Sequence, residues 1–324
     1  KVNEDSNMEY ALIGVGAAYA SSKQDKYLEG LERGIKWLAD REEMSDPCWK
    51  GSWYFVYSAK TGEHLPSSPG PGMMDARGVD ATSALFTYLL YLDQRLSSSS
   101  ALADRFAANG RAALDFVIRA NLAADDLSQS SWLQSEKTKQ WTLFEERYSA
   151  DQGDVYLGMH AGELLYQDVH YARVAERLKV KTPVMLFVSG QGRYALGRDS
   201  NGEVTSTDDG ISAAFSQGYL TWIWGGTKDN RAAIEWIRTK VEQDGSIVTV
   251  PGKPSYSLTI AMMGMADAAL AAPPPDGSLH WLLTHTFDSK TGGVHHSLDP
   301  ADNSESNNEA GFCVIALLRF LPFR

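Results

Sequence analysis

The chain has 324 residues, 43% of them hydrophobic and 22% charged, which is the balance of an ordinary globular protein. Its formal net charge of −11 argues against a nucleic-acid partner, because such a protein needs a basic face to neutralise phosphates. No stretch approaches the roughly 18 apolar residues that cross a bilayer, so we expect no transmembrane segment. Cys48 and Cys313 are too few and too far apart to predict a metal site or a disulfide framework.

Two kinds of helical run alternate along the chain. Six are apolar and nearly free of charge, as buried helices are: 9–20, 81–92, 154–166, 210–224, 257–271 and 309–320. Five are amphipathic, as helices that face water are: 25–42, 101–120, 168–188, 228–243 and 277–287. The alternation predicts an all-α fold, an (α/α)6 toroid of six inner helices ringed by outer ones, with the first partner helix missing or supplied by the N-terminus.

The links from outer to inner helices carry Gly or Trp and alternate enough to form short strands. We expect β-hairpins over one rim of the toroid from residues 51–63, 129–141, 192–203, 244–254 and 292–299. None of these links has the character of a domain boundary, and the prolines at 273–275 only end the preceding helix. Residues 1–324 are therefore expected to form a single domain.

A short motif recurs at these links. It consists of a basic residue, a small residue, an aromatic followed by an aliphatic, and then Gly-x-Trp or a similar turn. Copies begin at Arg33, Arg111 and Arg231, and a fourth, degenerate copy begins at His280. The motif resembles the QW motif of squalene-hopene cyclases and related class II terpene cyclases, with other residues in place of its Gln. Blurred versions also occur in pectate lyases and other polysaccharide enzymes with α/α toroids.

The segments that lead into the inner helices are rich in acids, including 75–80, 145–154 and 205–210. Such acids are ordinary helix caps, favoured by the positive end of the helix dipole. Asp80 stands out because Gly78-Val79-Asp80-Ala81-Thr82 follows the first repeat and resembles the DxDDT motif of the class II cyclases, whose middle Asp is the acid. Gly78 and Ala81 stand where that motif has further acids, so Asp75 would have to orient Asp80. Asp208, beside Asp209, is the rival acid.

The resemblance implies a protonation-initiated cyclase that acts on a small hydrophobic prenylated substrate of farnesyl type. A buried neutral acid would protonate the substrate, and aromatic walls would stabilise the carbocation. The residues expected to bind this substrate are Trp53, Tyr54, Arg77, Trp141, Tyr156, His160, Phe215, Tyr219 and Tyr256. No metal or other cofactor is expected, and a cyclase of this kind would be cytoplasmic.

The alternative is a polysaccharide lyase or glycoside hydrolase on the same fold, secreted or periplasmic. Asp80 would then pair with Asp208 or Asp151 as acid and base. A lyase would instead need cationic or phenolic groups near an acidic sugar, and the rim offers Arg77, Arg147, Lys253 and His295. A non-enzymatic toroid, like the thioester-containing complement domains, is disfavoured because no Gln lies near Cys313. The sequence indicates no oligomeric state.

Overall fold

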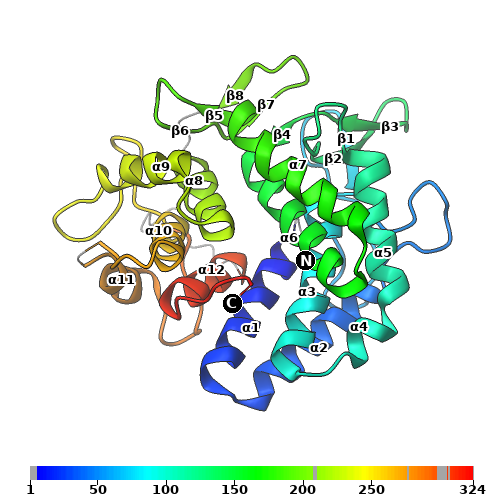
Figure 1. Cartoon of the computed structure of the whole chain (residues 1–324), viewed down its shortest axis with the longest axis horizontal. Coiled ribbons are helices and arrows are strands. Elements are labelled where there is room, and N and C mark those ends of the chain that lie inside the picture. Colours follow the sequence, from blue (N-terminus) through cyan, green and yellow to red (C-terminus); the bar gives the residue numbers. More distant parts are fainter. Residues whose placement is uncertain (1–5, 207–209, 276, 298–304, 306, 324) are drawn as a thin grey trace.

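A ring of six helices forms the centre of the molecule (Figure 1). The computed structural model describes residues 6–206, 210–275, 277–297, 305 and 307–323. Within them each inner helix contacts the next, and the last contacts the first. The inner helices are α1 (Asn7–Ser22), α3 (Asp80–Ser97), α6 (Ser149–Tyr166), α8 (Gly210–Trp224), α10 (Ser257–Ala269) and α12 (Asn307–Leu317). The (α/α)6 toroid predicted from the alternating helical runs is confirmed.

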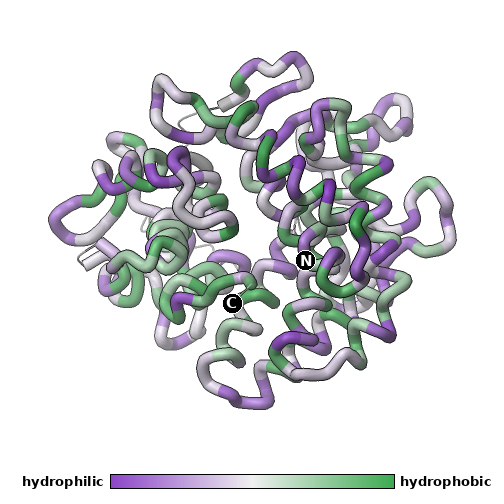
Figure 2. The backbone as a smooth tube through the Cα atoms, viewed as in Figure 1, coloured by the Kyte–Doolittle hydropathy of each residue, from purple (hydrophilic) through white to green (hydrophobic). Residues whose placement is uncertain are grey.

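The outer helices lie in the links between the inner ones. They are α2 (Asp25–Ala39), α4 (Ala101–Arg105), α5 (Ala107–Phe116), α7 (Val169–Leu186), α9 (Lys228–Arg238) and α11 (Ser278–Trp281), with π-helical turns η1 (Val117–Asn121) and η2 (Leu282–Thr286) after α5 and α11. The inner helices are buried nearly all round, as α10 is from Ser257 to Ala268, whereas α2 and α9 bury one face. Figure 2 shows the same contrast, with hydrophobic segments on α12 and its neighbours and hydrophilic tips on peripheral loops.

Glycines let neighbouring inner helices approach closely. A Cβ on Gly158 of α6 would lie 2.3 Å from the carbonyl oxygen of Ala84 on α3, and one on Gly14 of α1 would lie 2.5 Å from the Cα of Gly311 on α12. Only glycine has no side-chain atom at these points, so its presence sets how tightly the ring closes.

Short antiparallel strands occupy the links that lead into inner helices. β1 (Met73–Arg77), β2 (Ser131–Ser135) and β3 (Trp141–Phe144) form one sheet. β4 (Arg147–Tyr148), β7 (Gly197–Arg198) and β8 (Val204–Ser206) form a second, and β5 (Phe187–Val188) pairs with β6 (Arg193–Tyr194). Because β1 precedes α3 and pairs with β2, which precedes α6, both helices begin at the same end of the toroid. We call this end the strand-side mouth. Of the links expected to form hairpins, 129–141 and 192–203 contain strands, whereas 51–63 and 244–254 form only isolated bridges. Short strands on the loops are thus confirmed, but not at every expected link.

Helix α6 begins at Ser149, five residues before the start expected from its apolar run. Its polar first turn is buried because each polar group has a partner. Ser149 Oγ donates to the Ala195 carbonyl at 2.7 Å, and the Gln152 side chain bonds both the amide and the carbonyl of Ser128. Apolar periodicity misses such a turn, since it registers only hydrophobic burial.

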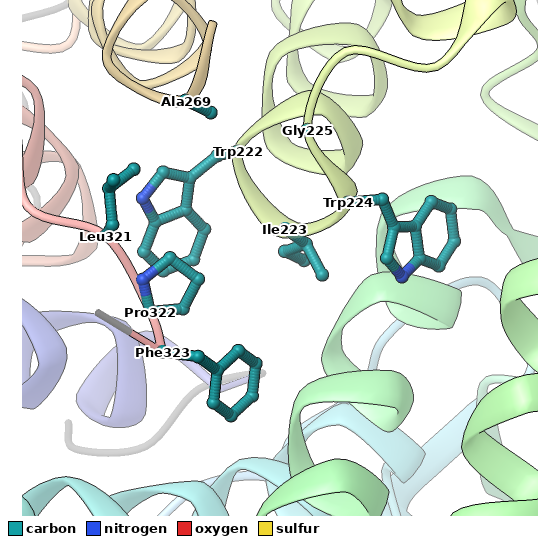
Figure 3. A pocket seen from close by; sticks show the side chains of 8 residues that line it. All are labelled: Trp222, Ile223, Trp224, Gly225, Ala269, Leu321, Pro322 and Phe323. Carbon is teal, nitrogen blue, oxygen red and sulfur yellow. The ribbon is translucent and has the colours of Figure 1, made fainter. Parts of the chain in front are cut away.

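The opposite end of the toroid is covered by the last residues of the chain. The Phe320 carbonyl accepts from Trp222 Nε1 at 2.7 Å, and the Pro322 carbonyl accepts from the Tyr88 hydroxyl at 3.0 Å. Figure 3 shows Leu321, Pro322 and Phe323 beside Trp222 around a pocket of about 180 Å³. We call this the closed end. No helix among the described residues is long and apolar enough to cross a membrane.

Candidate active site

Carboxylates gather where the inner helices begin. Their first two turns carry the acids Glu9, Asp80, Asp151, Asp154 and Glu309. Asp80, Asp154 and Glu9 have no exposed surface, whereas Asp151 is half-buried. Fully buried carboxylates are rare in proteins unless they are partnered or functional, so the strand-side mouth is the candidate site.

Asp154 lies at the centre of this mouth and is held by two phenols. The Tyr10 hydroxyl donates to its Oδ2 at 2.6 Å, and the Tyr219 hydroxyl donates to its Oδ1 at 2.5 Å. Burial raises the pKa of both tyrosines well above the usual value, and the charges of Asp154 and Asp151 raise it further. Both phenols therefore stay protonated and remain donors, which favours the charged form of Asp154.

Asp80 is the first residue of α3, and the backbone fixes it on both sides. Its amide donates to the Ser130 carbonyl at 2.9 Å, and its Oδ1 accepts from the Ala81 amide at 2.8 Å. Asn121 supports the same turn, because its Nδ2 donates to the carbonyls of Gly78 and Gln129. The N-cap position belongs to Val79, so Asp80 bonds its own helix start but is not the N-cap residue.

Asp80 and Asp154 lie at the same level on neighbouring helices. Ala84 and Gly158 are in direct contact where α3 meets α6. Asp80 is four residues before Ala84, and Asp154 is four residues before Gly158. Both helices run away from the strand-side mouth, and residues four apart lie one above the other on a helix, so the two carboxylates stand one turn above the contact.

Aromatic rings form the floor beneath these acids. Tyr10 packs against Phe312 with ring centroids 4.7 Å apart, and Phe215 packs against Tyr219 at 5.2 Å. Tyr10 also meets Phe215 and Tyr219 edge to face. Phe215 is half-buried, whereas the other three rings are buried. The mouth thus has an apolar floor with one ring that solvent reaches.

A histidine and a glutamate form a second polar group at the mouth. His296 Nδ1 bonds Glu309 Oε1, and Ser257 Oγ donates to Glu309 Oε2 at 3.1 Å. The ring of Tyr256 lies 5.1 Å from that of His296. The pair joins the link before α12 to the starts of α10 and α12.

Three of the residues expected to bind substrate lie away from this mouth. The His160 ring lies 4.6 Å from that of Phe323 at the closed end, and Tyr156 packs on Trp224 of the same end. Trp53 is 2% exposed and donates from Nε1 to the Leu38 carbonyl, so it joins an outer helix to the core.

Arg77, Tyr54 and Trp141 form a separate cluster over the first sheet. The Arg77 guanidinium lies 4.3 Å from the Tyr54 ring and 5.9 Å from the Trp141 ring, with Trp49 on it at 4.2 Å. Asp75 belongs to this group, since its Oδ2 lies 2.9 Å from His64 Nε2. Within the described residues, the partners of the Asp75 carboxylate are His64 and the amides of Ser67 and Ala76. Asp75 is therefore not placed to orient Asp80.

Phe215 and Tyr219 lie near Asp154, and Tyr256 lies near His296, whereas Asp208 lies outside the described residues. Asp154, Glu309 and the Tyr10 hydroxyl as a hydrogen-bond donor were not predicted from the sequence. Asp154 stands at the end of the acid-rich segment 145–154 and four residues before Gly158. This position, one turn before a glycine in an inner helix, is the sequence signal that could have identified it. For a metal ion, the described residues offer one cluster of three ligand types, Asp288, His295 and Glu305, in the link before α12.

No protein-family model matches the chain, and no curated protein sequence matches it significantly. Solved structures do match it. An unsaturated glucuronyl hydrolase from Bacillus sp. GL1, described as responsible for the degradation of glycosaminoglycan, is 13% identical with a TM-score of 0.63, over 98% of this chain and 87% of that one. A polysaccharide lyase is 12% identical with a TM-score of 0.62, over 98% and 90%. A sugar epimerase from a ruminal bacterium is 10% identical with a TM-score of 0.67, over 96% and 86%.

These structures show the fold and correct the expected family. The toroid matched along nearly the whole chain belongs to proteins described as acting on sugars, so the class II terpene cyclase, its carbocation chemistry and its prenylated substrate were wrong. The geometry of the motif agrees with this correction. Gly78 has a φ of 61° and a Cβ there would lie 2.7 Å from Phe116, so the Asp that opens the cyclase motif does not fit.

Proposed function

We propose that this chain is a glycoside hydrolase that cleaves an oligosaccharide at the strand-side mouth, with Asp80 and Asp154 as its acid–base pair. The observation that carries the proposal is the placement of these two buried carboxylates at one level on neighbouring inner helices. Glycoside hydrolysis needs a pair of carboxyl groups on either side of the scissile bond. A secreted or periplasmic location goes with this proposal.

The surroundings divide the roles between the two acids. Two buried carboxylates close together do not both ionise readily, so one of them keeps a proton. The phenols of Tyr10 and Tyr219 stabilise the charge on Asp154, and the proton is therefore held by Asp80. Asp80 then protonates the leaving oxygen while Asp154 takes a proton from the attacking water.

Hydrolysis is favoured over the lyase reaction by the state of Arg77 and Arg147, two of the four groups that the rim offers for a lyase. A lyase needs a cationic group free to neutralise the carboxylate of an acidic sugar. Arg77 is 4% exposed and enclosed by aromatic rings, and Arg147 pairs with Asp125 at 3.0 Å. The acids at the mouth suit a proton-transfer pair better than they suit an anionic sugar unit.

The purified chain should be incubated with pectic, glucuronan and neutral oligosaccharides, including fragments that end in an unsaturated uronic acid. Hydrolysis releases reducing ends without creating ultraviolet absorbance, whereas elimination creates a conjugated double bond that absorbs. Asp80→Asn and Asp154→Asn should each lower kcat by about 10²- to 10⁴-fold, as the loss of a general acid or base does. Retained turnover in either variant would refute the assignment of that residue, and elimination products would refute hydrolysis.

Asp115→Asn is the matched control. Asp115 also accepts a phenol hydrogen bond, from Tyr171 at 3.0 Å, but it lies between α5 and α7, away from the mouth. Its activity should equal that of the unchanged chain. Asp151→Asn tests the neighbouring acid: Asp151 is half-buried one turn above Asp154, and a loss of turnover confined to Asp151→Asn would transfer the base role to it.

A further inference from the structure

Three metal-ligand side chains converge in the link between η2 and α12, outside the acid–base pair. Asp288, His295 and Glu305 each offer one atom, and these atoms all lie within 4.8 Å of one another. Two backbone bridges create the arrangement, because Phe287 pairs with Val294 and His295 pairs with Glu305. Asp288 and His295 are half-buried, and Glu305 is exposed.

The three groups face one another without bonding to one another. Asp288 Oδ1 accepts from the Lys290 amide at 2.7 Å, and Glu305 Oε1 accepts from the Thr291 hydroxyl at 2.8 Å. Within the part of the chain that the structure describes, the remaining carboxylate oxygens and the His295 ring make no hydrogen bond or ion pair among themselves. Asp288 and Glu305 are therefore each held in place by one carboxylate oxygen while the other oxygen stays available as a ligand.

Glycine makes room for this approach. A Cβ on Gly293 would lie 2.2 Å from a carboxylate oxygen of Glu305, so any larger residue there would displace the acid. The carboxylates of Asp288 and Glu305 repel each other at this separation, and a cation bound between them would relieve that repulsion.

We propose that Asp288, His295 and Glu305 bind a divalent cation with the chemistry of Zn²⁺. One imidazole nitrogen and two carboxylate oxygens are a donor set that zinc accepts, with water completing the coordination. When three atoms lie at most 4.8 Å apart, some point lies within about 2.8 Å of all three, so small rotations of the side chains bring them to zinc–ligand distances of about 2.0–2.2 Å.

The site would fasten the link that supplies the mouth with His296. That residue directly follows His295 and bonds Glu309, while the carbonyl of His296 accepts from the Ser257 amide at 3.1 Å. A cation on His295 thus fixes the segment from which His296 reaches the mouth. Its effect is structural, and it requires no part in the reaction.

The test is a titration of the EDTA-treated full chain with ZnCl2 by calorimetry, with CaCl2 in parallel. We expect one Zn²⁺ per chain, at least tenfold weaker binding in His295→Ala, and no comparable Ca²⁺ site. Asp288→Asn and Glu305→Gln keep the acceptors for Lys290 and Thr291 but remove the charges, so they should weaken Zn²⁺ binding while melting as the unchanged chain does in EDTA. Hydrogen exchange at residues 288–297 should slow when Zn²⁺ is added.

His285→Ala is the matched control, because its imidazole stacks on Trp281 outside the cluster. It should bind Zn²⁺ as the unchanged chain does. The absence of a one-to-one Zn²⁺ complex, or equal binding by His295→Ala and the unchanged chain, would overturn the proposal. Preference for Ca²⁺ would overturn the choice of metal. Each outcome is independent of whether the chain hydrolyses an oligosaccharide.

Discussion

The phenol of Tyr10 donates a 2.6 Å hydrogen bond to Asp154, which lies 144 residues later in the chain. Tyr10 is on α1 and Asp154 is on α6, and these helices are separated in the ring by α3. The bond therefore crosses the middle of the toroid. It joins the packing of the ring directly to the orientation of a proposed catalytic carboxylate.

Tyr10→Phe should lower kcat more than it changes KM. The variant keeps the ring of the aromatic floor but leaves Asp154 with Tyr219 as its phenol donor. A hydrogen bond to a charged group is worth about 1.5–3 kcal/mol, so we expect a loss of about tenfold or more in kcat. The acidic limb of the pH–rate profile should move to higher pH, because the charged form of the base has lost a donor. An unchanged profile would show that the tyrosine only packs.

Gly158→Ala should destabilise the toroid. The new methyl group would lie 2.3 Å from the Ala84 carbonyl oxygen, so α3 and α6 must separate, at a cost of about 1–3 kcal/mol or more. Gly190→Ala is the control, since a Cβ there meets nothing within 4 Å. Urea unfolding of both variants gives the two free energies. Equal free energies of unfolding for the two variants would mean that α3 and α6 can move apart without cost.

Glu42 should make stability depend on pH. Burial raises the pKa of this carboxyl from 4.5 to about 8, and Asn109 and Lys50 offset only part of that effect. The folded chain binds the proton more tightly than the unfolded chain does, so this stabilisation is complete below pH 4.5 and is lost as pH rises through about 8. In Glu42→Gln the fall of a few kcal/mol over this range should vanish, as measured by unfolding at each pH.

Trp222→Phe should loosen the closed end. The indole of Trp222 is 2% exposed and donates to the Phe320 carbonyl at 2.7 Å. Its replacement leaves that buried acceptor unsatisfied and creates a small cavity, for a combined cost of about 2–4 kcal/mol. The rate of amide hydrogen exchange in residues 318–323 should also rise in this variant. Unchanged protection there would show that Tyr88 and the apolar contacts hold the segment unaided.

The inner and outer helices could be predicted because burial leaves a period of 3.6 in the sequence. The prediction failed where burial is polar: α6 begins five residues early because Ser149 and Gln152 satisfy backbone groups of other loops. It failed also in the outer layer, where the expected helix 101–120 is divided into α4, α5 and the turn η1. Tertiary hydrogen bonds decide where α6 begins, and they leave no periodic signal.

The function could not be predicted from the repeated motif because its aromatic residues build the toroid. Trp53 donates to the Leu38 carbonyl of an outer helix and packs on Phe86, 5.2 Å away. Such contacts serve any chemistry carried out at the mouth. Asp80 could be proposed from its position at a helix start, but proposing Asp154 needed the fold, since the tyrosines that hold it come from α1 and α8.

The closed end turns the toroid into a cup with one opening. A polymer cannot thread through it, because Phe320 and Pro322 are bonded across its base. For the proposed hydrolase, this shape means that the substrate enters and the product leaves through the strand-side mouth, where Asp80 and Asp154 lie.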